Sequence, residues 1–207
     1  MSESEWCLSE SVPDELRDPC RQLYSDVATL HHKWQLYRQL FSGFESTRIL
    51  SRTAQACFQT IAESLRNDMI TSICRLSDPE HTLGGDNLSL ASLVAQCTKV
   101  PHLDSLLTAF QSAAGAIRRL RNRRIPHNDL SATIMPRESP FPSVDQSQVE
   151  EILRLAAAVL KAINRHYSST ELEFPAILCG GAGDLISRLT SARQEHEQQP
   201  GHSKPQQ

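Results

Sequence analysis

The chain lacks any apolar run long enough to cross a membrane, any Cys-x-x-Cys pair and any recognisable export signal. A membrane-spanning helix needs about 20 consecutive apolar residues, and polar residues interrupt every apolar run of this sequence well before that length. The N-terminus, Met-Ser-Glu-Ser-Glu-Trp, is acidic and has neither the basic nor the apolar region of a secretory signal. Three of the six scattered cysteines fall inside apolar helical patterns, where a free thiol acts as a small hydrophobe. We therefore expect a cytoplasmic protein. Separately, we expect no cofactor.

Lysine is scarce and acidic residues are missing from one long window. The chain has 4 Lys against 17 Arg at a net charge of −3. A GC-rich genome produces the same excess of arginine, so only the clustering of arginine carries information. The 24-residue window from Ser105 to Asn128 holds no Asp or Glu. Its positive side chains lie together at its end: Arg118, Arg119, Arg121, Arg123, Arg124 and His127. Arginine offers a phosphate a permanent cation, and histidine can move protons near neutral pH.

Strand patterns are also absent, and apolar residues recur at helical spacing along most of the chain. Steps of three and four residues mark one face of a helix. The sequence predicts four principal helices, at about 20–41, 45–76, 101–124 and 145–167, with short helices near 88–97 and after Gly183. In the second helix the predicted buried stripe runs through Leu50, Ala54, Cys57 or Phe58, Ile61, Leu65, Met69, Ile73 and Leu76. The fold class is therefore all-α, a bundle of four principal helices plus short ones.

The length of 207 residues suits one good hydrophobic core. We expect a flexible acidic N-terminus over residues 1–18, a single helical domain over 19–191 and a disordered tail over 192–207. Within the domain, Asp78–Asn87 has the Pro, Gly and Asx residues of a loop. Asn87 or Ser89 could cap the short helix that follows it. Ser131–Ser147 contains three prolines and is long for a connection inside a bundle.

The arginines at the end of the 101–124 helix are expected to point in different directions. On an ideal helix Arg121 lies roughly 40° and Arg124 roughly 20° from the buried Ile117 position. The remaining arginines, Arg118, Arg119 and Arg123, point well away from Ile117. An inward cation must find a carboxylate, a phosphate or the water of a cleft. The sequence thus predicts two arginines that face inward or along an interface.

Pro126 is expected to end this helix, because proline removes a helix hydrogen bond and biases the preceding residue away from helical geometry. His127 then lies in the turn that follows. Asn128 or Asp129 can brace this turn, and Asp129 can orient His127 and support its protonated form. By themselves these residues indicate only a basic helix end.

At this stretch the chain resembles the HEPN superfamily (higher eukaryotes and prokaryotes nucleotide-binding). The superfamily signature is an Arg followed after four to six residues by His, commonly with Asn beside the Arg, and it maps onto Arg121, Asn122 and His127. From about Leu23 to Tyr167 the chain is similar to the abortive-infection U-type branch. The similar motifs are the entry Tyr-Arg-Gln-Leu-Phe at 37–41, Ile-Cys-Arg-Leu-Ser-Asp-Pro at 73–79, Asn-Leu-Ser-Leu at 87–90 and Leu-Arg-Asn-Arg-Arg-Ile-x-His-Asn-Asp at 120–129. The chain departs from the expected pattern at Pro126, where a small residue would be usual.

The resemblance implies a metal-independent endoribonuclease assembled by dimerisation, of a toxin or phage-defence type. The family reaction uses the RNA 2'-hydroxyl as nucleophile and needs a base, an acid and a cation. Each chain has one such histidine, so two chains would pair His127 and Arg121 in one cleft. Asn122 would bind phosphate or the motif of the other chain, and Arg75 and Asp78 are candidates for supporting residues. RNA, a second copy and an antitoxin protein are the candidate partners.

Each of these readings has a structural alternative. Arg121 and His127 could cap a helix end or pair with acids across the bundle. The arginines at 118, 119, 123 and 124 could form a solvated helix face, with RNA-backbone contact by Arg118 and Arg123 as the functional reading. His31 and His32 are adjacent but have no evident third metal ligand, and we expect no metal site. The chain could also be a non-catalytic module that binds RNA, nucleotide or protein, or a structural dimerising bundle.

Overall fold

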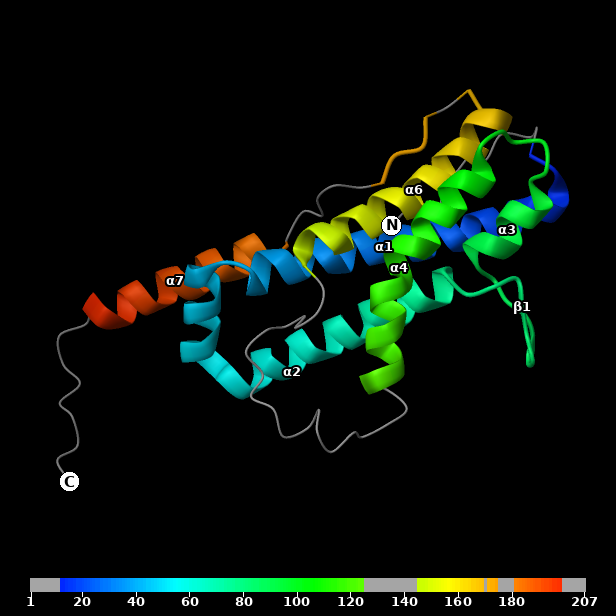
Figure 1. Ribbon diagram of the computed structural model, residues 1–207. Coiled ribbons are helices and arrows are strands. Elements are labelled where there is room, and N and C mark those ends of the chain that lie inside the picture. Colours follow the sequence, from blue (N-terminus) through cyan, green and yellow to red (C-terminus); the bar gives the residue numbers. More distant parts are fainter. Residues whose placement is uncertain (1–11, 125–144, 170, 175–180, 199–207) are drawn as a thin grey trace. The chain divides into compact units, whose positions relative to one another are not determined.

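The computed structural model describes residues 12–124, 145–169, 171–174 and 181–198 (Figure 1). These residues are almost entirely helical, so the all-α prediction is confirmed. The helices are α1 (Asp14–Phe41), α2 (Phe44–Leu76), α3 (Leu90–Gln96), α4 (Leu103–Arg124), α6 (Gln146–Tyr167) and α7 (Ala182–Gln198). Two short strands, β1 (His81–Thr82) and β2 (Gly85–Asp86), form an antiparallel hairpin between α2 and α3. No helix within the described ranges is both long and apolar enough to span a membrane.

Helix α1 begins earlier than the expected start near Cys20. Its first turns are held by the burial of Val12, Leu16 and Cys20, each at most 4 % exposed. Pro19 lies inside the helix, where it removes one backbone hydrogen bond. Burial of these apolar side chains offsets that loss, so residues 14–18 are helical rather than a flexible lead-in.

Helix α2 is bent at Ala54, whose φ of −159° and ψ of 73° are not helical. The sequence has no Gly or Pro there and predicts one continuous helix. The bend separates the apolar positions before and after it, so they do not share one face. Of the predicted stripe, Leu50, Met69, Ile73 and Leu76 are buried, whereas Ala54, Cys57 and Ile61 are exposed. Phe58, the alternative to Cys57, is partly buried and packs against a core. The stripe prediction is therefore right at its two ends and at Phe58, and wrong at Ala54 and Ile61.

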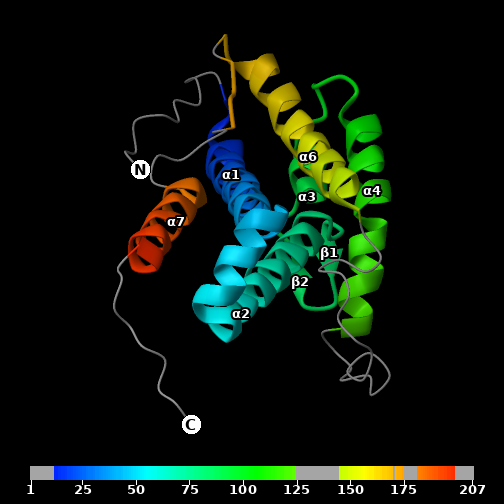
Figure 2. The same cartoon turned by 90° about the vertical axis from the view of Figure 1, so that its left-hand side faces the viewer.

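The described residues divide into two compact units, and α1 and α2 each contribute to both. Unit 1 comprises residues 1–31 and 66–175, and unit 2 comprises residues 32–65 and 176–207. In unit 1, α6 lies along α4 in both views (Figures 1 and 2), and α3 also packs on α4. Their shared core includes fully buried Phe110, Ile117, Ala156 and Val159. In unit 2, Leu40, Leu50 and Ala182 form a small core against which Phe58, Ile186 and Leu189 pack.

Candidate functional site

The candidate site lies in unit 1, where the last turns of α4 meet the C-terminal end of α2. Ile117 and Leu120 are buried and fix the rotation of α4 about its axis. With this rotation Arg121 is half-buried and Asn122 is exposed. The arginine thus lies at the edge of the core, as the helical spacing predicts.

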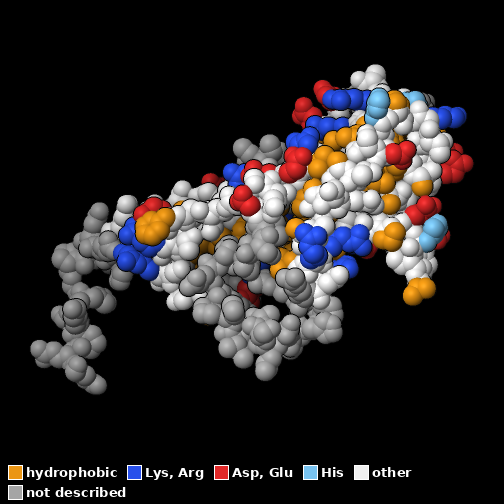
Figure 3. All heavy atoms as spheres, in the orientation of Figure 1, with side chains coloured by type: hydrophobic (Ala, Val, Ile, Leu, Met, Phe, Trp, Pro, Cys, Tyr) orange, Lys and Arg blue, Asp and Glu red, His pale blue; other side chains and the backbone are white. Residues whose placement is uncertain are grey.

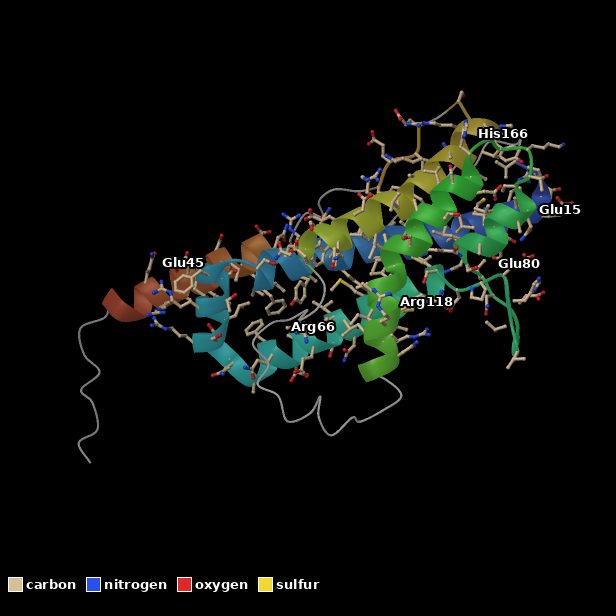
Figure 4. All side chains as sticks on the ribbon, viewed as in Figure 1. Glu15, Glu45, Arg66, Glu80, Arg118 and His166 are labelled. Atoms are coloured by element: carbon tan, nitrogen blue, oxygen red, sulfur yellow. The ribbon has the colours of Figure 1, made fainter. Side chains whose placement is uncertain are left out.

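Arg118 is anchored to the end of α2 rather than turned to solvent. Its Nη1 donates a hydrogen bond to the Ser77 carbonyl oxygen at 3.1 Å, and its Nη2 lies 3.7 Å from Asp78 Oδ1. Figure 4 labels Arg118 on α4, beside the last turn of α2. The expectation that Arg118 points outward is therefore wrong, whereas its predicted contact with RNA stays a prediction. The long side chain reaches the unpaired carbonyls at a helix C-terminus, where positive charge is favourable.

Arg121 also lies over the end of α2. Burial raises the pKa of the Cys74 thiol, while the nearby cations Arg121 and Arg118 oppose that rise and Asp78 adds to it. Cys74 is completely buried in α2, so both guanidinium groups lie close to the last turns of that helix. Arg121 Nε donates a hydrogen bond to Asn122 Oδ1 at 3.3 Å. Among the described residues, no carboxylate lies within ion-pair distance of Arg121.

Arg75 and Asp78, two of the predicted supporting residues, make different contacts. Asp78 pairs with Arg118, whereas Arg75 turns to α1 and donates to Asp26 Oδ2 at 2.6 Å. Asp26 is only 16 % exposed and was not foreseen as part of this region. A sequence signal for it does exist, because an acid at this position interrupts the apolar pattern formed by Leu23 and Val27.

Several predicted site residues cannot be placed. His127, Asn128 and Asp129 lie outside the described residues. Arg123 and Arg124 belong to the last turn of α4, and only their backbone is described. The structure therefore brings together Arg118, Arg121, Asn122 and Asp78.

Positive charge marks this region in the space-filling view. Figure 3 shows Lys and Arg side chains gathered over α4. Arg119 is exposed there, and Arg121 is partly accessible. No Asp or Glu occurs between Ser105 and the end of α4. The charged side chains of its last turns are therefore all positive, which favours the binding of an anion.

The structure offers no metal site in the part of the chain it describes, where no three His, Cys, Asp or Glu side chains come together as ligands. His31 is instead a packing residue. Its ring stacks on Phe174 with centroids 5.3 Å apart, and burial lowers its pKa despite a hydrogen bond with the backbone of Leu153.

Comparison with known proteins yields one match. A model of the family described as AbiU2 (HEPN_AbiU2) matches residues 14–178. No curated protein and no solved structure matches the chain.

Proposed function

Because the chain belongs to the AbiU2 family of HEPN proteins, we propose that it is a metal-independent endoribonuclease whose site forms between two copies of the chain. The observation that carries this proposal is the burial of Arg121 and the set of groups that surround it. It is half-buried and has a neighbouring amide but no carboxylate partner among the described residues. Arg118 and Arg75, by contrast, are both paired with acids. A partly desolvated cation without a counter-charge suits a phosphate ligand.

The reaction follows from these groups and from His127. One histidine removes the proton from a 2'-hydroxyl, whose oxygen forms a bond to the adjacent phosphorus. The bond between phosphorus and the 5'-oxygen breaks, and His127 of the partner subunit donates a proton to that leaving oxygen. The products are a cyclic phosphate and a 5'-hydroxyl end. Arg121 stabilises the negative charge that develops on the phosphate, and Asn122 holds a phosphate oxygen.

Neighbouring residues support this arrangement in distinct ways. Arg118 positions the end of α4 by binding Ser77 and Asp78. Asp129 and Asn128 orient His127, while Arg123 and Arg124 extend the positive surface toward the RNA backbone. The biological role that fits such an enzyme is toxin or phage defence, with an antitoxin protein as a candidate partner.

RNA cleavage in the presence of EDTA tests the proposal. Arg121→Ala and His127→Ala should each reduce cleavage by about 100-fold or more, the usual contribution of such groups. Arg154→Ala is a matched control, because Arg154 is an exposed arginine on α6 that pairs with Glu151. Cleavage that persists in both site variants, or that requires a divalent metal, would overturn the proposal.

A non-catalytic HEPN module is the second candidate function, and Pro126 favours it. The proline directly precedes His127 and restricts the backbone of that turn. This alternative predicts RNA or nucleotide binding by the wild-type chain with the RNA left intact.

A further inference from the structure

The hairpin between α2 and α3 is a firmly built element with an apolar tip. Across its base, His81 Nδ1 lies 2.7 Å from Asp86 Oδ1, and Asn87 Nδ2 donates to the Pro79 carbonyl at 2.8 Å. Its two-residue turn is Leu83–Gly84, and Gly85 has a φ of 123°, which suits glycine alone. An isolated two-stranded hairpin is marginal in water, so these polar bonds are what define its shape.

Nothing in its own chain covers this hairpin within the described residues. Every residue from Pro79 to Asp86 is exposed, and Leu83 at the tip is as exposed as a side chain can be. In Figure 1 the hairpin extends away from the helices of unit 1, and Figure 3 shows hydrophobic atoms at its end. A defined loop that holds a leucine in water gives the monomer no packing energy.

The hairpin starts at the candidate site. The end of α2 that Arg118 holds, Ser77 and Asp78, is followed directly by Pro79 and the first strand. If two chains meet at their α4 ends, as the proposed function requires, each hairpin begins next to the partner subunit.

Charge identifies the surface that the hairpin fits. Glu80 and Asp86 flank the leucine tip, and His81 between them offsets only part of their charge. The end of α4 carries the opposite charge, because Arg119 is exposed there, Arg121 is half-buried and this part of the sequence has no acidic residue. The acidic hairpin and the basic helix end are complementary in charge, and no ion pair joins them within the described part of one chain. A second copy of the chain is therefore the partner that this charge pattern fits.

We propose that the 80–86 hairpin is a dimerisation arm that docks onto the basic end of α4 in a second copy of the chain. Leu83 leaves water on docking, while Glu80 and Asp86 face the partner's Arg119. This inference takes from the proposed function only that the two α4 ends meet in the dimer. Docking then places the hairpin of one chain beside Arg121 of the other chain.

A single substitution tests the apolar contact. Leu83→Asn removes the apolar side chain without adding charge and should raise the dimer dissociation constant measured by sedimentation equilibrium by about tenfold or more. Leu185→Asn is the control, because Leu185 is an exposed leucine of α7, in unit 2, and its dissociation constant should stay within about twofold of wild type. Circular dichroism confirms that each variant folds. A wild-type chain that stays monomeric, or a Leu83→Asn dimer as tight as wild type, overturns the proposal.

A charge exchange tests whether the contact joins two chains. Glu80→Lys/Asp86→Lys and Arg119→Glu should each weaken the homodimer, because both of its contacts become repulsive. Mixing the two variants should restore the dimer, since each hairpin then meets an opposite charge. A mixture that stays as weak as the single variants shows that the two charges do not meet between chains, which overturns the arm.

RNA cleavage separates this inference from the proposed function. If the dimer responds to both sets of substitutions as expected but leaves RNA intact, the dimerisation arm is supported and the nuclease proposal is wrong. RNA cleavage by a dimer whose dissociation constant does not change in Leu83→Asn keeps the nuclease and overturns the arm.

Discussion

Arg118 and Arg121 lie about one turn apart on α4 but differ in what surrounds them. Helical spacing predicted that Arg121 borders the core, and it is half-buried. The same reasoning placed Arg118 in solvent, and this was wrong because an angle describes only where a side chain leaves the helix. A guanidinium reaches several ångströms further, and here it reaches the Ser77 carbonyl. The sequence could not predict that partner, because nothing in the spacing of α4 reveals where α2 ends.

The cysteines should differ sharply in reactivity. Burial raises the pKa of Cys20 to about 12 and of Cys97 to about 11, and it also raises that of Cys74, whereas Cys57 is exposed. Since only the thiolate is alkylated, iodoacetamide at pH 8 should label Cys57 in the folded chain and leave the three buried thiols unmodified until urea is added. Peptide mass spectrometry measures this. Equal labelling of Cys57 and Cys20 in the native protein would contradict the packing of α1.

His31 should make the fold less stable in acid. Burial lowers its pKa below the ordinary value of 6.5, so the unfolded chain binds a proton more readily than the folded chain. Stability contributed by the neutral ring is present above pH 6.5 and is lost as the pH falls below that value. Urea unfolding at pH 7.5 and 5.5 should therefore show a smaller loss of stability on acidification in His31→Gln than in wild type. An identical loss in both proteins would rule out this role for His31.

At the scale of the element, the sequence predicted that a polar side chain caps the start of α3, but not which one. Asn87 and Ser89 were both candidate caps, and the structure uses Ser89 in a reciprocal box with Ser92, while Asn87 binds the Pro79 carbonyl at the base of the hairpin. The local sequence contains both cap residues, but only the path of the preceding hairpin selects between them.

Removing the Ser89 cap of α3 should lower the stability of the fold measurably, although only one hydroxyl group is lost. The Ser89 side chain accepts from the Ser92 amide at 3.2 Å and is fully buried. Ser89→Ala leaves that amide unsatisfied and should lower the free energy of unfolding by about 1–2 kcal/mol. Chemical denaturation measures the change, with Ser105→Ala as control, because the Ser105 hydroxyl only donates to a carbonyl at an exposed position. Equal effects of the two substitutions would argue against the capping box.

The bend in α2 carries no comparable sequence signal. Kinks normally accompany Pro, Gly or an inserted side chain, and residues 45–65 contain neither Pro nor Gly. The apolar spacing predicts a straight helix with one stripe. Contacts of Leu50 and Phe58 in the small core of unit 2 override this local preference, which is why the exposed positions Ala54 and Ile61 were misassigned.

At the scale of the molecule, the family match confirms the HEPN resemblance inferred from the stretch at 120–129 and its flanking motifs. The single domain predicted over residues 19–191 stays a prediction, as do the roles of His127 and Asp129. The two compact units were not foreseen, because helical periodicity identifies a buried face without identifying its neighbour.

The small core of unit 2 should depend on its last helix. Ala182 of α7 contributes to the cluster with Leu40 and Leu50, so a chain truncated after Phe174 should expose those leucines. Hydrogen exchange should show lost protection around Leu50 and retained protection around Phe110 and Val159, which belong to unit 1. Protection lost uniformly across both units would show that the units do not unfold separately.

Unit 1 is discontinuous along the chain, and this affects how the protein must be synthesised. The first half of α1 buries Leu23 and Val27, and its His31 bonds with Leu153 of α6. Residues 32–65 belong to unit 2 and intervene. A ribosome adding about 5–20 residues per second takes roughly 6 to 30 s to pass from α1 to the end of α6. Until α6 has been synthesised, the apolar face of α1 stays exposed to water. We therefore expect ribosome-associated chaperones to bind the nascent chain.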